Sequence, residues 1–422
     1  MEMLDIEVFE GGFKETELGP LPEEWEVVRL GDVVKIIKGK KPRTLNENPS
    51  KKSLPYLTAE YFRYGVPKQF VDIEVEKDLP ICKKEDVVLI WDGSKAGQVF
   101  MGLEGVLAST MVKIIPTINN LDKLYLYCFL ATKFDYLNSQ TTGSTIPHVN
   151  KTVFFNLPLP LPPLEEQKAI AGILSTVQSA IEKTEKVINA LKNLKKSMMK
   201  HLFTYGPVAE QEAEKVELKE TEIGLIPKHW EVVRVGEVVK IIKGKKPRTL
   251  NENPSKNSLP YLTAEYFRYG VPKQFVDIEV EKDLPICKKE DVVLIWDGSK
   301  AGQVFMGLEG VLASTMVKII PTINNLDKLY LYCFLTTKSD YLNSQTTGST
   351  IPHVNKTVFF NLPLPLPPLE EQQKIAQILQ RIDQRIEKEE KYKNALQNLF
   401  KSLLHNLMTG KIRVRVKDHG ED

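Results

Sequence analysis

The sequence lacks the long apolar segments of membrane proteins, and it contains only four cysteines and six histidines. No apolar run approaches the ~18–20 residues that a transmembrane helix needs. The first residues, MEMLDIEVFEGGFKE, are acidic and have no signal-peptide core, so we expect a cytoplasmic protein. Cys82, Cys128, Cys287 and Cys333 form no C-x-x-C pair, which predicts reduced, buried thiols.

A strong excess of charge is also missing. Lys plus Arg total 57 and Asp plus Glu total 55, which gives a net charge of +2 over 422 residues. This balance excludes a histone-like protein but allows a local basic patch. Hydrophobic residues at 42% and charged residues at 27% are typical of a globular chain. At about 150 residues per domain, the length suggests two or three domains.

Catalytic and cofactor-binding motifs are absent as well. We find no G-x-x-x-x-G-K-[ST] phosphate loop, no G-x-G-x-x-G after a strand and no cysteine–histidine spacing for zinc. Pro162-Pro163 is flanked by leucines, unlike an adenine-methylating site, and Glu166-Gln167-Lys168 has no nuclease-type Pro-Asp upstream. The sequence therefore predicts a protein that is not an enzyme and that holds neither a metal ion nor a cofactor.

The chain is a tandem duplication with an offset of 205 residues, from Lys14–Thr204 to Lys219–Thr409. Residues 35–167 differ from their second copy at only three positions, Lys52/Asn257, Ala131/Thr336 and Phe134/Ser339. After Gln167 the copies diverge sharply. The module was therefore copied or homogenised separately from the residues after it, either because both copies do the same job or through recombination without functional meaning.

Each module has the pattern of a mixed α/β domain. Runs of β-branched residues at 25–39, 85–93 and 106–116 predict strands, and helical spacing predicts one helix over 121–137. The module ends in NLPLPLPPLEEQ, where alternating prolines favour an extended backbone. Pro163 followed by Glu165 and Glu166 is a helix-start signal.

A long amphipathic helix comes after each module. In each helix, apolar residues recur at a spacing of three to four residues. The first stripe is Ile170, Leu174, Val177, Ile181, Ile188, Leu191, Met198 and Leu202, with gaps at Thr184 and Lys195. The second stripe is Ile375, Leu379, Ile382, Ile386, Leu396, Phe400, Leu403 and Leu407. About 40 residues span ~60 Å, too long to be covered by one small domain. We expect the two helices to pack on each other as a coiled coil; the alternative is two separate surface helices.

Four polar or basic segments of the module form a candidate nucleic-acid surface: 35–52, 61–65, 91–98 and 139–151. Loop lysines bind phosphates, whereas Arg, Asp and Gln can contact base edges. The alternatives are a solvated loop for the first segment, a buried aromatic pair for the second, a plain hairpin for the third and an ordinary polar loop for the fourth. The candidate DNA-binding residues are Lys38, Lys40, Lys41, Arg43, Tyr61, Arg63, Asp92, Ser94, Lys95, Gln98, Thr142, Ser144, Thr145, His148 and Asn150, with Lys243, Lys245, Lys246, Arg248, Tyr266, Arg268, Asp297, Ser299, Lys300, Gln303, Thr347, Ser349, Thr350, His353 and Asn355 in the second copy.

The sequence resembles the specificity subunits of Type I restriction-modification enzymes. The resemblance rests on LPEEWEVVRLGDV, the KGKKP turn, DVVLIWDGSKAG and, most specifically, LPLPLPPLEEQKAIAGIL, with the repeat equivalents of these segments. The order module, long helix, module, long helix covers nearly the whole chain.

The resemblance implies an α/β (α+β) fold in which two near-identical target recognition domains are joined by two long helices. The helices would form an antiparallel coiled coil with pseudo-two-fold symmetry. The implied boundaries are 1–163 for the first recognition domain, 164–206 for its helix, 207–218 for a linker, 219–368 for the second domain, 369–410 for its helix and 411–422 for a tail.

The same resemblance implies partners. Each module would bind one half of a split site in double-stranded DNA. Methyltransferase subunits, two of them, would dock on the helices, and restriction or translocase subunits would join them. The S-adenosylmethionine, ATP and Mg would belong to those partners and not to this chain.

The near-identity of the modules departs from the usual family pattern of two different modules. Two-fold protein symmetry is matched by palindromic DNA, so we predict identical half-sites on opposite strands with a fixed spacer. We expect Lys52/Asn257 to alter affinity slightly and the other two differences to leave the sequence preference unchanged. The alternatives are a free-standing two-fold DNA-binding regulator, a protein-binding scaffold, or an enzyme with an unrecognised site.

Overall fold

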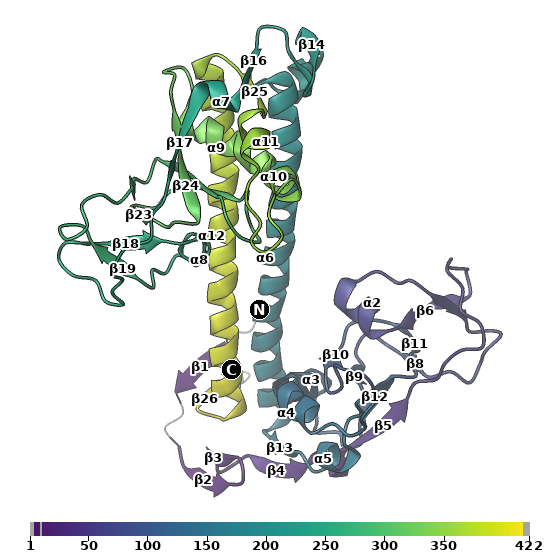
Figure 1. The fold of residues 1–422 in the computed structure, drawn as a ribbon. Coiled ribbons are helices and arrows are strands. Elements are labelled where there is room, and N and C mark those ends of the chain that lie inside the picture. The colour runs from purple at the N-terminus through teal and green to yellow at the C-terminus, as the bar shows by residue number, and fades with distance from the viewer. Residues whose placement is uncertain (1–3, 9–10, 417–422) are drawn as a thin grey trace, which may run out of the picture. The chain divides into compact units, whose positions relative to one another are not determined.

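The computed structural model describes residues 4–8 and 11–416, which form two compact units. One unit comprises the residues up to Glu185 and those from Lys391 onward, and the other runs from Lys186 to Glu390. Each unit contains one module and the first half of the long helix that follows it. It also contains the second half of the other long helix (Figure 1). The parts of the expected first domain and tail at 1–3, 9–10 and 417–422 lie outside the described residues.

The first module and its flanking elements have these bounds: β1 Leu4–Val8, β2 Phe13–Thr16, β3 Gly19–Pro22, β4 Glu26–Arg29, α1 Leu30–Val33, β5 Val34–Lys38, β6 Ser53–Leu57, α2 Ala59–Tyr64, β7 Phe70–Asp72, β8 Ile81–Cys82, β9 Val87–Ile90, β10 Val99–Phe100, β11 Gly105–Leu107, β12 Met111–Pro116, α3 Lys123–Thr132, α4 Phe134–Ser139, α5 Lys151–Phe155, β13 Pro158–Leu161 and the long helix α6 Leu164–Tyr205.

The second module repeats this order: a 3-10 turn at Glu210–Lys215, then β14 Leu218–Thr221, β15 Gly224–Pro227, β16 Glu231–Arg234, α7 Val235–Val238, β17 Val239–Lys243, β18 Ser258–Leu262, α8 Ala264–Tyr269, β19 Phe275–Asp277, β20 Ile286–Cys287, β21 Val292–Ile295, β22 Val304–Phe305, β23 Gly310–Leu312, β24 Met316–Pro321, α9 Lys328–Thr337, α10 Ser339–Ser344, α11 Lys356–Phe360, β25 Pro363–Leu366, the long helix α12 Leu369–Met408 and β26 Ile412–Val416.

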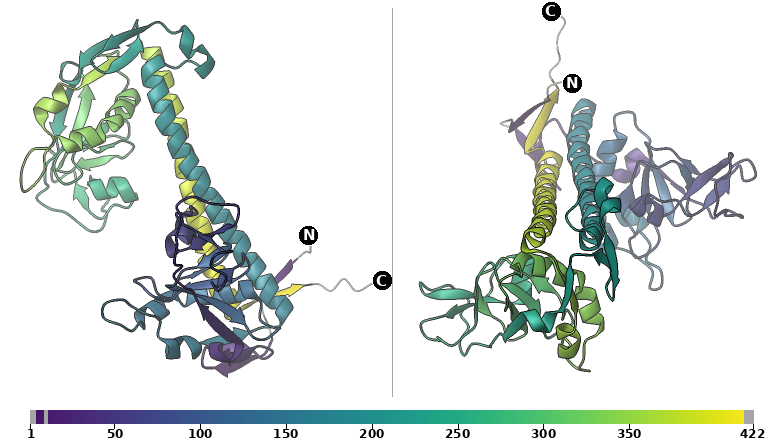
Figure 2. Two further views of the ribbon diagram at one scale, coloured as in Figure 1. Left: turned by 90° about the vertical axis from the view of Figure 1, so that its right-hand side faces the viewer. Right: turned by 90° about the horizontal axis from the view of Figure 1, so that it is seen from above.

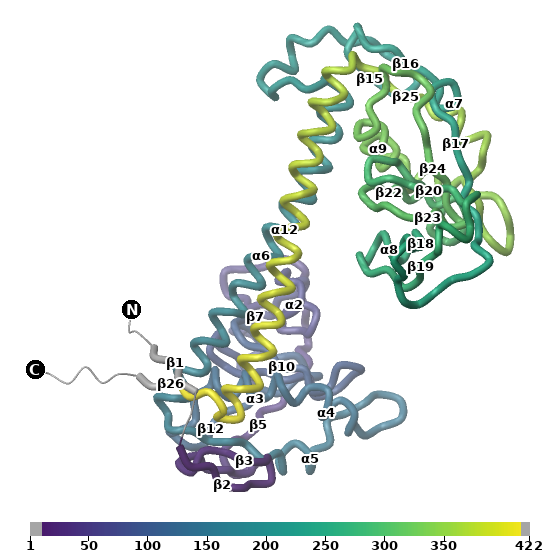
Figure 3. Tube along the Cα trace, turned by 90° about the vertical axis from the view of Figure 1, so that its left-hand side faces the viewer, coloured from purple at the N-terminus to yellow at the C-terminus, as the bar shows by residue number. Residues whose placement is uncertain are grey.

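Two four-stranded sheets build each module. In the first, the strand orders are β10-β9-β12-β5, all antiparallel, and β7-β6-β11-β8, in which only β6 and β11 run parallel. The strand β13 pairs with β4, and β2 and β3 form a hairpin. The second module has the same sheets, with β16 beside β25 (Figure 3). The predicted mixed α/β class with two repeated domains is confirmed.

The strand β9 is buried on both of its faces and separates two apolar cores. Val87 and Leu89 point into the core that contains the helices, whereas Val88 and Ile90 point into the core between the two sheets. Successive side chains of a strand alternate between its faces, so a continuous apolar run matches a strand that is covered on both sides. The four cysteines are free and buried, as predicted.

Two of the expected elements are interrupted. The strand over 25–39 is split by the one-turn helix α1, because β4 pairs with β13 whereas β5 pairs with β12 of another sheet. The single helix expected over 121–137 is two helices that meet at Lys133, whose backbone N–H donates to Leu130 three residues back. The change of direction brings Asn138 to the 92–98 turn, where its amide donates to the carbonyls of Ser94 and Ala96.

A buried glutamine ties each module to its long helix. Gln167 is fully buried; its Oε1 accepts from the Asp122 backbone N–H at 2.9 Å, and its Nε2 donates to the carbonyls of Asn120 and Pro162 at 2.8 Å each. Gln372 makes the same three bonds in the second module. Because every polar atom of this amide has a partner, the glutamine that ends the LPPLEEQ segment can be buried at the start of each helix.

The neighbouring glutamate anchors a buried tryptophan. Trp25 donates its indole N–H to Glu166 at 3.1 Å, and Arg413 of β26 also binds Glu166. The strand β26 pairs with β1, which joins the two ends of the described chain (Figure 2). In the second unit Trp230 donates to Glu371, and the ring of His229 replaces the arginine at 2.8 Å. The equivalent glutamates Glu166 and Glu371 thus bind the same indole group but different basic side chains.

The long helices run antiparallel in each unit. In the second unit, Lys192 pairs with Glu390 at 2.9 Å and Lys195 with Asp383 at 2.6 Å, so residue numbers rise along one helix as they fall along the other. In the first unit, Lys393 lies 3.8 Å from Glu185. Both polar residues that interrupt the apolar stripe of α6 have a partner. The buried Thr184 donates to the Ala180 carbonyl, and Lys195 pairs with the Asp383 carboxylate. The predicted antiparallel packing is confirmed.

Replacing Gln167 by Leu should destabilise the first unit strongly. We expect Gln167→Leu, and likewise Gln372→Leu, to lower the free energy of unfolding by about 3 kcal/mol, because three backbone groups around the buried amide lose their partner. Calorimetry should show a lower unfolding temperature. The control is Gln211→Leu on the exposed 3-10 turn, which should change stability by less than about 0.5 kcal/mol. An unchanged transition for Gln167→Leu would contradict this account.

A second prediction concerns acid stability. Burial of Asp86 would raise the pKa of its carboxyl, but hydrogen bonds from the Lys83 N–H, Lys123 and Lys113 outweigh this effect and lower the pKa. The depressed pKa stabilises the fold above the ordinary Asp value of about 3.9, and this contribution is lost as pH falls through the folded pKa.

The matched variant is Asp86→Asn. At neutral pH it should cost about 2 kcal/mol, because two partly buried lysines lose their partner. At pH 3, below the ordinary pKa of Asp, the penalty should be smaller than at neutral pH, because the stabilisation from the ionised carboxylate decreases as the pH falls toward its folded pKa. Urea unfolding at both pH values measures the difference, and a penalty that grows in acid would disprove the assignment.

Candidate nucleic-acid interface

The structure brings together three candidate residues from distant segments. The Asp92 carboxylate accepts from Lys38 Nζ at 3.0 Å through Oδ2, and His148 Nδ1 lies 2.6 Å from its Oδ1. Lys38 ends β5, Asp92 follows β9 and His148 lies in the loop before α5. Asp92 is 13% exposed, whereas the lysine and histidine side chains are about half exposed. The cluster therefore presents a cation and an imidazole around a largely covered carboxylate.

Backbone pairing fixes this cluster in place. Asp92 and His148 form a β-bridge, and the Thr142 and His148 backbones exchange hydrogen bonds of 2.9 and 2.7 Å. Gly143 has φ +97°, and a Cβ there would lie 2.6 Å from the Ile146 carbonyl and 3.0 Å from the His148 ring. Only glycine fits such a position without strain.

A second pair lies on α2 and the 92–98 turn. Arg63 donates from Nη2 to Gln98 Oε1 at 2.7 Å. Arg63 is exposed and Gln98 half-buried, so the guanidinium keeps free donors for a base edge or a phosphate. Tyr61 is half-buried against the core between the sheets, whereas Tyr64 is 72% exposed. The more accessible aromatic ring of this segment is therefore Tyr64.

The basic loop after β5 is anchored over its first six residues. Gly39 packs so closely on the β11–β12 turn that a Cβ would lie 2.0 Å from the Ala108 carbonyl. The Lys40 side chain donates to the Asp78 carbonyl. The Glu76 carboxylate accepts from the backbone N–H groups of Arg43 and Thr44, and these bonds lower the pKa of Glu76.

Several candidates lie elsewhere in the module or have another partner. Asn150 caps α5, accepting from the backbone N–H groups of the second and third residues after it. Ser144 and Thr145 lie on the exposed tip of the same loop, and Ser94 and Lys95 lie on the exposed side of the 92–98 turn. Lys41 and Arg43 are exposed on the basic loop.

The second module reproduces the arrangement. Lys243 and His353 contact Asp297 at 3.0 and 2.6 Å, and Arg268 contacts Gln303 at 2.7 Å. The remaining candidates of this module occupy equivalent elements. Sequence reasoning missed the residues that hold these groups, notably Glu76, Asn138 and their second copies. Their partners lie more than 30 residues away, and no local pattern marks such pairs.

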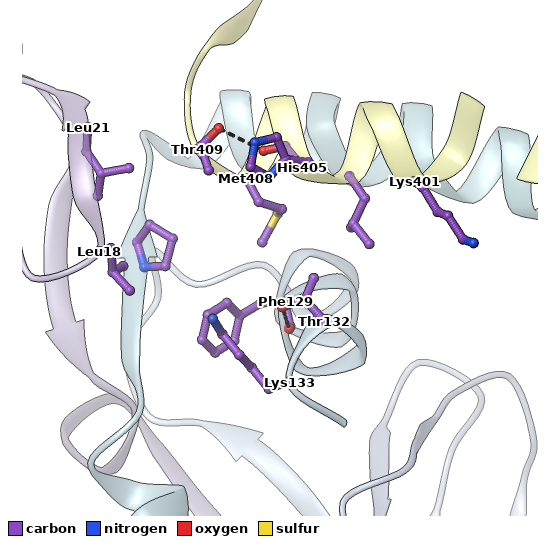
Figure 4. Close-up of a pocket in the computed structure, with 11 residues that line it drawn as sticks. Leu18, Leu21, Phe129, Thr132, Lys133, Lys401, His405, Met408 and Thr409 are labelled. Atoms are coloured by element: carbon purple, nitrogen blue, oxygen red, sulfur yellow. Dashed lines mark hydrogen bonds between the residues drawn. The ribbon is translucent and has the colours of Figure 1, made fainter. Parts of the chain in front are cut away.

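A pocket of about 390 Å³ lies away from these clusters, in the first unit (Figure 4). Phe129, Met408 and Leu21 give it a largely apolar lining. Lys133 also lines it, with its Nζ 5.2 Å from the Phe129 ring centroid, and burial lowers the pKa of this lysine. None of the candidate DNA-binding residues borders the pocket.

Both modules, each with part of its helix, match a known family. Residues 22–193 and 227–398 fit the model of the type I restriction modification DNA specificity domain. The chain belongs to this family. Two specificity subunits from Methanocaldococcus jannaschii are similar over nearly their whole length. That of the type I enzyme MjaVIII is 37% identical, over 96% of this chain and 97% of the relative, and that of the putative enzyme MjaX is 30% identical, over 96% and 98%.

The fold agrees with this assignment. The crystal structure of the type I restriction-modification S subunit from M. genitalium has a TM-score of 0.65 to this specificity subunit, at 17% identity over 91% of this chain and 96% of that one. Members of the family are DNA-recognition components that assemble with other restriction-modification subunits and are not enzymes themselves. In the part of the chain that the structure describes, no helix is long and apolar enough to span a membrane.

One of the three differences between the modules of this specificity subunit touches a candidate contact. Lys95 Nζ lies 6.0 Å from the Phe134 ring centroid, and Ser339 replaces that ring beside Lys300 in the second module. Lys52 forms an exposed ion pair with Glu74 at 2.5 Å, which Asn257 cannot make. The hydroxyl of Thr336 donates to the Tyr332 carbonyl within its own helix.

The Phe134 ring should affect affinity and leave the base preference unchanged. A cation–π contact of about 0.5–1 kcal/mol orders Lys95, and an ordered cation loses less entropy on binding a phosphate. We expect Phe134→Ser to weaken DNA binding by about twofold and Ser339→Phe to strengthen it by a similar factor. Fluorescence anisotropy at fixed salt measures both. Ala131→Thr is the control, and equal affinities of the reciprocal variants would refute the effect.

Proposed function

We propose that each module binds one half of a split DNA site, and that the two half-sites are identical, lie on opposite strands and are separated by a spacer of fixed length. The observation that carries this proposal is the repetition of the same exposed clusters in both modules, Lys38–Asp92–His148 with Arg63–Gln98 and their second copies. Equal side chains in equal geometry favour equal bases.

The antiparallel packing of the long helices supports the placement of the half-sites on opposite DNA strands. In each unit one long helix runs antiparallel to the other, which favours an inverted over a direct repeat. The 42 residues of α6 span about 63 Å, longer than one DNA turn of about 34 Å. The helices are therefore long enough to set two modules on successive major grooves.

We further propose that methyltransferase subunits, two per chain, dock on the helices and that restriction subunits join the assembly in the cytoplasm. The S-adenosylmethionine, ATP and Mg would be held by those partners. The sequence carries none of the phosphate-loop, dinucleotide-binding or zinc-binding motifs named above, which is consistent with this division of labour.

Selection from a random DNA pool, with the chain bound to its methyltransferase, tests the proposal. We expect a split palindrome with one spacer length, bound with a steep dependence on salt. A direct repeat, two different half-sites or the absence of any enriched site would contradict the proposal.

A one-sided variant sharpens the test. Arg268→Ala changes only the second module, so the selected site should lose base preference in one half and keep it in the other. Arg63→Ala should have the same effect through the first module. If either change weakened both halves equally, the modules would not recognise DNA independently.

A further inference from the structure

The two nitrogens of the His148 ring have different surroundings. Nδ1 faces Asp92 at 2.6 Å, whereas Nε2 makes no hydrogen bond within the described residues, on a side chain that is 47% exposed. A ring nitrogen that faces a carboxylate carries the proton. In the neutral ring, Nε2 therefore has a lone pair and acts as a hydrogen-bond acceptor. His353 and Asp297 have the same arrangement.

Asp92 itself is poorly placed to contact a base. One of its oxygens binds Lys38 and the other binds His148, and only 13% of the side chain is exposed. From the sequence alone, this aspartate is a candidate for direct contact with a base edge. In the structure it is the neighbouring imidazole that reaches solvent, while the carboxylate orients it.

The ring is held firmly enough to discriminate between bases. The β-bridges of His148 to Asp92 and to Thr142 fix its backbone, and the close approach of Gly143 limits the space beside the ring. A side chain held in one geometry loses less conformational entropy on binding than a mobile one.

We propose that His148 and His353 are specificity-determining residues, each accepting a hydrogen bond at Nε2 from an exocyclic base amine in the major groove. That amine is adenine N6 or cytosine N4; guanine offers acceptors in the major groove and would be disfavoured. Asp92 and Asp297 are positioning residues, which set the imidazole tautomer. The inference rests on the proposed function, because it names a base contact of the same site.

The tautomer can be measured without DNA. The full chain, labelled with nitrogen-15 in its histidines, should show the Nδ1–H form for His148 and His353 in long-range proton–nitrogen spectra at mildly alkaline pH. Asp92→Ala with Asp297→Ala should remove this bias, and Asp135→Ala with Asp340→Ala is the control. A dominant Nε2–H form in the wild type would overturn the proposal.

The base contact is tested by DNA selection with the methyltransferase complex. His148→Leu with His353→Leu should reduce discrimination by about tenfold at one adenine or cytosine position in each half-site and leave the other positions unchanged. Asp92→Asn with Asp297→Asn should weaken the same position less. As a contrast, Lys41→Gln with Lys246→Gln, on exposed lysines of the basic loop, should lower affinity for all sequences alike.

The outcomes separate this inference from the proposed function. If the wild type selects a site that the histidine variants also select unchanged, the inference fails alone. It fails too if those variants lose affinity uniformly, or if the lost position is a guanine contacted by the histidine. If the wild type selects no sequence, the proposed function and this inference fail together.

Discussion

The buried amide at the start of each long helix is the contact on which the placement of the module depends. Gln167 and Gln372 satisfy three backbone groups each, in a site that water does not reach. A buried amide is tolerated only when its donors and acceptors are paired, so the site demands glutamine and one geometry. The neighbouring Glu166 adds the indole of Trp25 to the same junction. Together these bonds set the angle at which the module leaves its own helix.

Buried contacts also hold the candidate DNA-binding clusters in place. The strand β9 is covered on both faces, and Asp92 lies two residues after its last residue, Ile90. Asn138 on α4 holds the turn from the other side. The cluster of Lys38, Asp92 and His148 is therefore built on a strand that cannot shift without opening two apolar cores. Such a platform suits discrimination between bases, which depends on bond geometry more than on affinity.

The contrast between near-identical modules and diverged helices has a physical explanation. Lys195 and Asp383 form an ion pair in the second unit, and the equivalent positions of the first unit are Phe400 and Gln178, which line one groove. Helix packing accepts different side chains if volume and charge remain compatible. Base recognition does not, because exchanging one donor or acceptor changes the preferred base. The near-identity of the two sequence copies ends at Gln167, the residue whose amide binds the module to its long helix.

The sequence by itself determined the duplication, the end of each module at the LPPLEEQ segment, the two long helices and the family. These features are local patterns or long stretches of matching residues, and both can be recognised without knowing any contact. Only the tertiary structure decided which candidates share a cluster, where α1 and Lys133 interrupt the expected elements, and that Asp92 contacts His148. Asp92 and His148 are 56 positions apart in the sequence, and the order of strands in the sheet brings them together. Strand order results from packing of the whole module, and no local propensity encodes it.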